Sequence, residues 1–394
     1  MGKSAPNFFL IYIAVFLNVA AFSMVFPLLP VYAKTFQASN ATIGLLGASF
    51  AFSQFLFSPL LGKLSDRFGR KPILAFGLAG MSATFLFFAL APGLIWLFVA
   101  RSLQGLFSGA TIPTARAYIA DLTSNKERVR GMGKIGAAAA LGVIFGPTLG
   151  GILAEGHIAV PFLLGAVIAA SNFLFILLFL PESLRQKTSR FRIGWQNLFY
   201  GIHIWKGLRG PLAPFFLFAF IWSFLLSTNQ VALPLLGLEK LELHSAQIGT
   251  LFGLMGAVLA FVQFFLLAKI TAFWGERLSV PLGLLLMALG FSLLPFVPFI
   301  ALLYPLMALV GFGSSISKPV NAALLSQETQ AEQGITMGTA NAFESLGRLA
   351  GPFLGGFLFG FGMTLPFLFS GAVTMLVIFF VWRYTIFLRV NHTY

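Results

Sequence analysis

One glycine pattern occurs twice in the chain at a constant spacing. Gly133, Gly142, Gly146, Pro147, Gly150 and Gly151 recur 205 residues later as Gly338, Gly347, Gly351, Pro352, Gly355 and Gly356. We call these twelve residues the glycine ladder. Both copies lie in long apolar stretches, where small residues four positions apart let two membrane helices approach closely. The repeat therefore predicts two similar membrane-embedded halves, an arrangement typical of secondary transporters.

The composition supports a membrane protein. Hydrophobic residues make up 58% of the 394 positions and charged residues 9%, whereas soluble domains average roughly 25% charged residues. We expect an all-α polytopic membrane protein with twelve transmembrane helices in two pseudo-symmetric six-helix halves. Stretches long enough to cross a bilayer lie near 8–33, 41–61, 72–91, 94–120, 130–154, 159–181, 212–237, 245–268, 278–297, 299–326, 334–360 and 365–388.

The basic residues predict domains and orientation. Nearly all loop Lys and Arg fall on one side of the predicted spans, with only Lys34 and Lys240 on the other, so both termini are expected to be cytoplasmic. The halves are 1–181 and 212–394. Between them, 182–211 mixes basic and aromatic residues, which indicates a helix on the inner membrane surface or a disordered basic tether. The first apolar stretch is expected to be a span rather than a cleaved signal peptide.

The composition and motifs argue against several function classes. The chain has no Cys and four scattered His, so we expect no disulfide, no metal and no cofactor. The net charge of +14 comes from residues that flank spans, which argues against a nucleic-acid partner. No Walker loop is present, and no catalytic constellation indicates an enzyme. The expected partners are a small-molecule substrate, protons and membrane lipids, and the expected state is a monomer.

The turn after the second predicted span carries a specific motif. It reads Gly-Lys-Leu-Ser-Asp-Arg-Phe-Gly-Arg-Lys-Pro over 62–72, and it resembles the loop-2/3 signature of the major facilitator superfamily. An ordinary basic turn would require neither the acid nor the two glycines. The resemblance implies a gate in which Asp66 binds the start of the eleventh predicted span, 334–360, and Arg70 faces Asp121. The implied gating residues are Gly62, Asp66, Arg67, Gly69, Arg70, Lys71 and Asp121.

A degenerate copy of this motif follows the eighth predicted span. It retains Lys269 and Gly275, but Ala272 stands where the first copy has its acid. The second half is therefore expected to keep the turn without the lock.

Two further patterns match motifs of the superfamily. Arg101 and Gln104 resemble its buried-Arg motif on helix 4, and an Arg inside a span costs about 3 kcal/mol unless it is paired or hydrated. The resemblance implies a cation in the transport cavity; the alternative is an Arg that extends to the outer surface. The first copy of the glycine ladder matches a helix-5 motif found mostly in antiporters, particularly drug exporters. It implies a moving helix contact, whereas close packing alone would also favour small residues.

The end of the first span looks like that of tetracycline and multidrug exporters, with Asn18 where many of them have an acid. An amide does not exchange a proton near neutral pH, which weakens proton coupling at this position. We expect the substrate cavity to be lined by polar residues on several spans, namely Asn18, Gln54, Gln104, Asn229, Gln230, Gln263, Ser315, Asn321 and Asn341.

One acid lies deep within a predicted span. Glu344 is about 15 Å from the inner end of the eleventh predicted span, 334–360, at 1.5 Å per residue, and Arg348 follows one turn later on the same face. Lys318 lies about 13 Å deep on helix 10. Charged residues at such depth are functional candidates, so Glu344, Arg348, Lys318 and Arg101 form the predicted coupling set. A static ion pair is the alternative.

These observations predict a secondary active transporter in the inner membrane of a bacterium, which exports a lipophilic or drug-like molecule in exchange for protons by alternating access. A second reading is a facilitator or importer of a small, anionic metabolite without proton exchange, since four cations (Arg101, Arg116, Lys318 and Arg348) lie within spans. A third is a transport-dead sensor or scaffold, against which the intact Asp66 motif argues.

Overall fold

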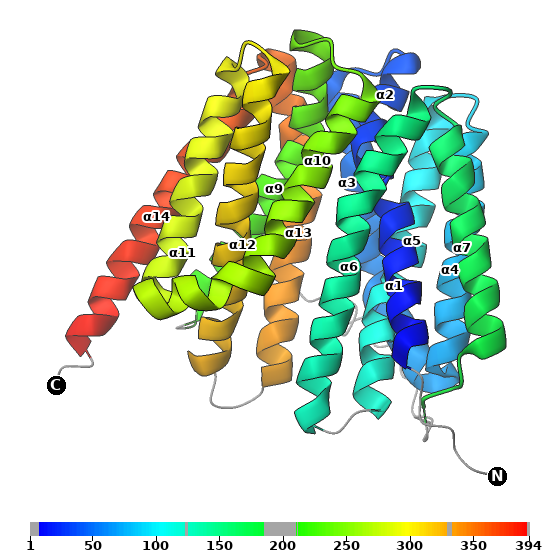
Figure 1. The fold of residues 1–394 in the computed structure, drawn as a ribbon, viewed down its shortest axis with the longest axis horizontal. Helices are drawn as coiled ribbons and strands as arrows, with labels where there is room; N and C mark the ends of the chain where they lie inside the picture. The colour runs from blue at the N-terminus through cyan, green and yellow to red at the C-terminus, as the bar shows by residue number, and fades with distance from the viewer. Residues whose placement is uncertain (1–7, 123–124, 185–209, 211, 329–332, 392–394) are drawn as a thin grey trace. The chain divides into compact units, whose positions relative to one another are not determined.

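The computed structural model describes residues 8–122, 125–184, 210, 212–328 and 333–391. In this part of the chain every regular element is a helix (Figure 1). Apolar sequence favours this outcome, because a helix satisfies its backbone hydrogen bonds within one segment, as the bilayer interior requires. The predicted surface helix within 182–211 lies almost wholly outside the described residues.

The first half folds into helices that follow the six predicted spans. The first span divides into two helices at Met24, because Pro27 lacks the N–H that would continue the backbone bonding. The helices are α1 (Phe8–Ser23), α2 (Val25–Thr35), α3 (Asn40–Phe68), α4 (Arg70–Ala89), α5 (Leu94–Leu122), α6 (Asn125–Ala154) and α7 (Val160–Phe179).

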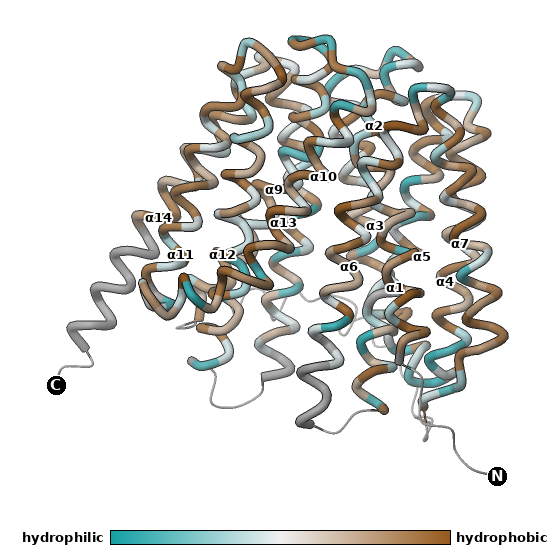
Figure 2. The backbone as a smooth tube through the Cα atoms, in the orientation of Figure 1, coloured by the Kyte–Doolittle hydropathy of each residue, from teal (hydrophilic) through white to brown (hydrophobic). Residues whose placement is uncertain are grey.

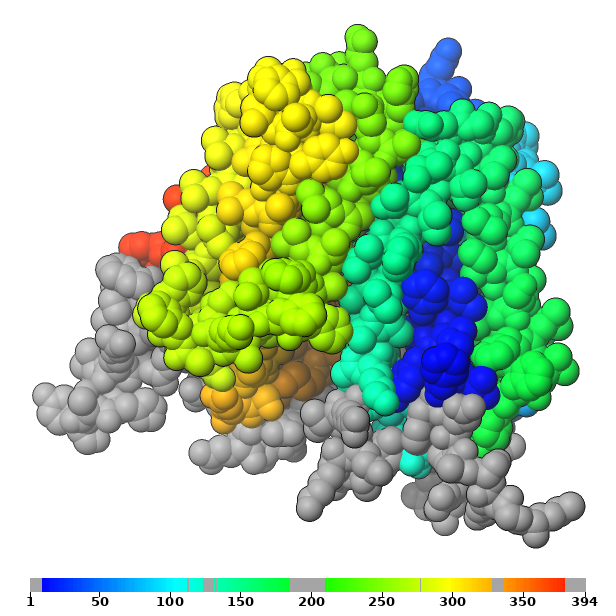
Figure 3. Space-filling model, viewed as in Figure 1, coloured from blue at the N-terminus to red at the C-terminus, as the bar shows by residue number. Residues whose placement is uncertain are grey.

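The second half repeats this arrangement, with a π-helix and two short 3₁₀ turns in addition. Its helices are α9 (Ala213–Lys240), α10 (Ser245–Phe261), the π-helix η2 (Val262–Leu266), α11 (Leu267–Leu293), the short 3₁₀ turns η3 (Leu294–Phe296) and η4 (Ile300–Leu302), α12 (Leu303–Glu328), α13 (Gln333–Phe361) and α14 (Leu365–Asn391). A continuous apolar stretch spans Ser245–Glu276. A straight helix of this length would measure about 48 Å, against a hydrocarbon core of about 30 Å. The π-helix bends the chain, and the segment that follows forms a ridge on the surface (Figure 3).

Ten helices of the described part are long and apolar enough to cross a membrane, and a shorter apolar stretch covers Leu365–Phe379 in α14. Helix α13 is not among them, since Glu344, Arg348 and its glycines make it less apolar. Figure 2 shows hydrophobic residues along the helices of both halves.

The chain forms two compact units. Unit 1 comprises Met1–Ala38, Ser49–Leu198 and His244–Gly253, and unit 2 comprises Ser39–Ala48, Phe199–Leu243 and Leu254–Tyr394. The start of α3 thus groups with the second half, and the start of α10 with the first.

Each unit has its own core. In unit 1, α4 packs on α5 and α7, and α1 lies between α6 and α7 (Figure 3). The core there includes Ile11, Leu74, Ile119 and Ile176. In unit 2, α9 packs on α13, and α11 packs on α12 and α14. Phe216 stacks on Phe343 across the α9–α13 contact, with ring centroids 5.6 Å apart.

Candidate functional site

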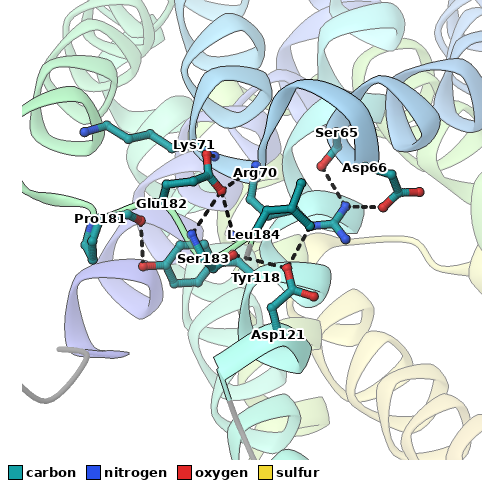
Figure 4. Close-up of polar contacts among 10 residues, drawn as sticks. All are labelled: Ser65, Asp66, Arg70, Lys71, Tyr118, Asp121, Pro181, Glu182, Ser183 and Leu184. Carbon is teal, nitrogen blue, oxygen red and sulfur yellow. Dashed lines mark hydrogen bonds and ion pairs between the residues drawn. The ribbon is translucent and has the colours of Figure 1, made fainter. Parts of the chain in front are cut away.

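Arg70, the first residue of α4, is the centre of a polar cluster at the α3–α4 turn (Figure 4). Its Nε donates to Asp121 Oδ2 at 2.9 Å, and its Nη1 donates to Ser65 Oγ at 3.0 Å and to Asp66 Oδ1. The Arg70 side chain is 10% exposed, whereas that of Asp66 is 52% exposed. Solvent weakens the Asp66 pair, so Asp121 is the stronger of the two acidic partners. The contact expected between Arg70 and Asp121 is present.

The turn is made by one glycine rather than two. Gly69 has φ +120°, a conformation that side chains with Cβ atoms rarely adopt. Gly62, in contrast, lies within α3, and a Cβ atom there would meet nothing within 4 Å. Although the motif begins at Gly62, the chain does not reverse there, because α3 continues as a helix to Phe68. The remaining basic residues lie around the cluster: Arg67 is over the ring of Phe68, and Lys71 contributes its backbone N–H.

Glu182, which the sequence reasoning placed in the linker, belongs to this cluster. Its Oε1 accepts the N–H of Arg70 at 2.8 Å, and its Oε2 accepts the N–H of Lys71 at 3.2 Å (Figure 4). The neighbouring Ser183 donates from Oγ to Asp121 Oδ2 at 3.2 Å. The available signal was an acid directly after the sixth span, on the same side of the membrane as the 62–72 turn.

The degenerate copy keeps the backbone geometry of the first. Gly275 has φ +75°, and in the described part of the chain only Gly69 and Gly275 are glycines with positive φ. At this copy Gln327 Nε2 donates to Glu276 Oε2 at 3.0 Å. The second half therefore keeps the turn, but the Arg70–Asp121 ion pair of the first half is replaced there by a hydrogen bond from a neutral amide to an acid.

The glycine ladder lies at the same helix contact in both halves. A Cβ atom at Gly146 would overlap Ser23 Oγ and Ala20 O on α1, and one at Gly351 would overlap Ser227 Oγ and Phe224 O on α9. The other ladder glycines make equivalent contacts in the two halves. On α6, Gly142 lies against Ala20 and Gly150 against Met24; on α13, Gly347 lies against Phe224 and Gly355 against Thr228. The last glycine of each copy contacts the start of another helix: Gly151 lies against Ser245, and Gly356 against Asn40. Only glycine allows this approach.

Hydroxyl groups reinforce the ladder. In the first half, Ser23 Oγ donates to Gly142 O at 2.9 Å. In the second half, Ser227 Oγ donates to Gly347 O, and Thr228 Oγ1 donates to Gly351 O. The two prolines, Pro147 and Pro352, lie inside α6 and α13. Gly133 and Gly338 differ from the other members, because a Cβ atom at either would meet nothing within 4 Å. They are part of the sequence repeat without being part of the close contact.

Three members of the predicted coupling set, Lys318, Glu344 and Arg348, lie together in unit 2. Lys318 Nζ on α12 donates to Glu344 Oε2 at 2.9 Å, and Arg348 Nη1 on α13 lies 3.6 Å from the same oxygen. The Glu344 side chain is 16% exposed. Lys318 also lies over the ring of Trp222, 4.3 Å from its centroid, and Arg348 Nη2 donates to Ser345 Oγ. Two cations thus share one carboxylate oxygen.

Arg101 is buried rather than extended toward the outer surface, with 5% of the residue exposed. Its Nη1 donates to Gln104 Oε1, and its guanidinium lies 4.8 Å from the centroid of Phe50. Within the described residues its Nε and the Nε2 of Gln104 have no acceptor. A buried cation with neutral partners is costly, which keeps Arg101 a functional candidate.

The polar residues predicted to line the cavity have different surroundings. Asn18 is buried in unit 1, donates to Thr111 Oγ1 at 3.3 Å, and borders a cavity of about 10 Å³ among apolar side chains, too small for a substrate. Gln54 donates a hydrogen bond to Ser108 Oγ, and Asn321 donates one to Phe215 O. Asn229 and Ser315 each donate to a backbone carbonyl of their own helix. Gln230 is half-buried, and Gln263 and Asn341 are exposed.

Comparisons with known proteins place these features in a family. The model of the Major Facilitator Superfamily matches residues 11–270 and 215–390. Multidrug resistance protein 2 of Bacillus subtilis is 30% identical over 376 residues, which cover 94% of this chain and 93% of that protein. Tetracycline resistance protein class C of Escherichia coli is 30% identical over 344 residues, 86% of each chain. The crystal structure of the human organic anion transporter MFSD10 (TETRAN) shares the fold, with a TM-score of 0.72 and 24% identity over 97% of this chain and all of that one.

The fold and these matches define a multi-pass membrane transporter, not an enzyme. The chain belongs to the major facilitator superfamily, and the relatives reported above are multidrug and tetracycline resistance proteins, the group that the sequence motifs resemble.

Proposed function

We propose that this transporter exports lipophilic, drug-like molecules by alternating access, in exchange for protons. One observation supports coupling most directly: Glu344 on α13 is bound by both Lys318 on α12 and Arg348 on α13, along stretches that the sequence predicts to cross the membrane. Charged groups in this environment are costly unless they are paired. A change that separates the carboxylate from its cations favours proton uptake, and restoring the contact favours release.

The Arg70 cluster and the glycine ladder supply the conformational part of this proposal. Asp66 is the proposed lock, with Arg67 and Lys71 adding positive charge at the turn and Asp121 holding Arg70. The overlap that any side chain would cause at Gly146 and Gly351 supports a smooth helix contact that permits sliding. Both termini are proposed to be cytoplasmic, which the excess of loop Lys and Arg on one side of the spans supports, and the relatives support the plasma membrane of a bacterium.

The substrate contacts belong to the same proposal. Exposed or half-buried amides, namely Gln54, Gln230, Gln263 and Asn341, have hydrogen-bonding capacity for a substrate. Asn18, Gln104, Asn229, Ser315 and Asn321 are buried, so their contribution to binding requires an opening of their helices. We propose a monomer as the working unit, because each half of the chain repeats the other and one chain supplies both.

A second candidate function is transport of an organic anion without proton exchange. It is favoured by the excess of positive charge in the Glu344 cluster, where two cations meet one acid. In addition, Trp222 Nε1 beside Lys318 is buried with no acceptor among the described residues. An anionic group would accept hydrogen bonds from these donors.

Substrate counterflow in proteoliposomes, with and without an imposed pH gradient, tests these functions. Proton-coupled export predicts counterflow in both conditions and uphill accumulation only with the gradient. An anion facilitator predicts counterflow that the gradient does not drive uphill. The absence of any counterflow for a range of lipophilic and anionic probes would leave the sensor or scaffold reading.

A further inference from the structure

The carboxylate of Glu182 joins two segments of unit 1 that are distant in sequence. It accepts the backbone N–H groups of Arg70 and Lys71 at the start of α4, and those of Ser183 and Leu184 that follow it, both at 3.0 Å (Figure 4). The chain that leaves α7 is thereby attached to the first turn of α4.

This contact suits the chemistry of a helix start. The first N–H groups of a helix have no partner within the helix, and a negative charge there is favoured. The positive φ of Gly69 turns the chain so that the next two N–H groups meet Glu182. A Cβ atom at Gly69 would overlap Glu182 Oε2. Gly69 is thus favoured by its backbone conformation, and a side chain at this position would have to displace the end of Glu182.

The same segment also contacts Asp121, the acidic partner of Arg70. Tyr118 donates from its hydroxyl to Pro181 O at 3.0 Å, and Ser183 Oγ donates to Asp121 Oδ2 at 3.2 Å. Arg70 Nε donates to that same carboxylate oxygen. Residues 181–184 therefore fix both the backbone of Arg70 and the side chain it binds.

The second half shows that the turn itself does not need this contact. A Cβ atom at Gly275 would meet nothing within 4 Å, although Gly275 also has positive φ. In the described part of the second half, no side chain lies against Gly275 as Glu182 lies against Gly69.

We propose that Glu182 is a positioning residue for Arg70: by binding the first N–H groups of α4, it holds the guanidinium where it bridges Asp66 and Asp121. This inference rests on the proposed role of those ion pairs in alternating access. Glu182 touches no proposed substrate or proton site, so it acts on the rate of the conformational change and not on substrate binding.

The test uses Glu182→Gln in the full-length transporter, since the amide keeps the size of the side chain but presents an NH₂ group to N–H donors. In proteoliposomes the maximal transport rate should fall about fivefold, the scale of losing a helix cap, while KM stays unchanged. Hydrogen–deuterium exchange at the start of α4 should accelerate by a similar factor. Glu155→Gln, an exposed acid between α6 and α7, is the matched control and should change neither quantity.

Two further variants separate positioning from general damage. Glu182→Asp retains the charge and should recover part of the rate. With Arg70→Lys, whose single ammonium does not bridge two carboxylates, adding Glu182→Gln should cause no further loss. Wild-type rate and exchange in Glu182→Gln, or an additive loss with Arg70→Lys, would overturn the inference. Absence of transport in the wild type would overturn the proposed function instead, and amide exchange would still decide whether Glu182 holds α4.

Discussion

Gln327 donates a hydrogen bond to Glu276 at 3.0 Å, and the two residues stand 206 positions after Asp121 and Arg70. The equivalent pair of the first half is an ion pair at 2.9 Å. Both halves therefore keep a polar contact between corresponding helices, but only the first half uses opposite charges. The contact thus has the same position in both halves, but the charges of the two residues that make it differ.

We expect Asp121→Asn to be far more harmful than Glu276→Gln. Asp121→Asn deprives the largely buried Arg70 guanidinium of its less exposed acidic partner, which typically costs about 1–3 kcal/mol. Glu276→Gln leaves an exposed amide pair and should change stability by less than about 0.5 kcal/mol. Thermal unfolding in detergent measures both variants, and equal shifts would contradict this difference between the halves.

Asp66→Asn should abolish transport while expression stays near normal. The Asp66 side chain is half exposed, so its pair with Arg70 adds little to stability, and its main effect is expected on the conformational change. Transport by the Asn variant at the wild-type rate would show that the motif is only a basic turn. Expression level and thermal stability, measured on the same preparation, control for misfolding.

Gly146→Val and Gly351→Val should reduce transport while substrate binding survives. Each valine would enter a contact with Ser23 or Ser227 that has no room for a Cβ atom, where overpacking costs about 1–3 kcal/mol. Gly136→Val and Gly360→Val introduce the same side chain on the same helices at positions with nothing within 4 Å. The controls should transport normally. A parallel loss of binding and transport at Gly146 would indicate misfolding rather than a blocked movement.

Much of this architecture was predictable because it depends on periodic or repeated signals. Apolar length gave the spans, and the 205-residue repeat gave the equivalence of α6 and α13. Helical rise predicted similar depths for Lys318 and Glu344, and the i+4 spacing predicted that Arg348 lies on the same face as Glu344; in the structure the three are in contact. The Arg70–Asp121 contact followed from a motif resemblance.

Other features depend on tertiary contacts that carry no local signal. Gly62 and Gly69 look alike in sequence, but only Gly69 lies where the chain must reverse against Glu182. Glu182 itself gains its role from a helix that begins 112 residues earlier. The π-helix at Val262–Leu266 arises in an apolar run whose composition resembles that of any other span.

The Glu344 cluster forms the proposed proton switch. Lys318 from α12 and Arg348 from α13 both bind Glu344 Oε2, while α9 contributes the neutral ring of Trp222. A conformational change that withdraws the cations would leave an unpaired carboxylate in a low-dielectric environment, which then binds a proton. Glu344→Gln cannot exchange that proton, so it should lose uphill export driven by a pH gradient while downhill substrate exchange continues.

Lys318→Gln is the companion variant: it should weaken coupling without removing the titrating group. Both are measured by transport in proteoliposomes with an imposed gradient. If Glu344→Gln still concentrates substrate when a proton gradient is the sole driving force, the cluster is a static ion pair and protons couple elsewhere.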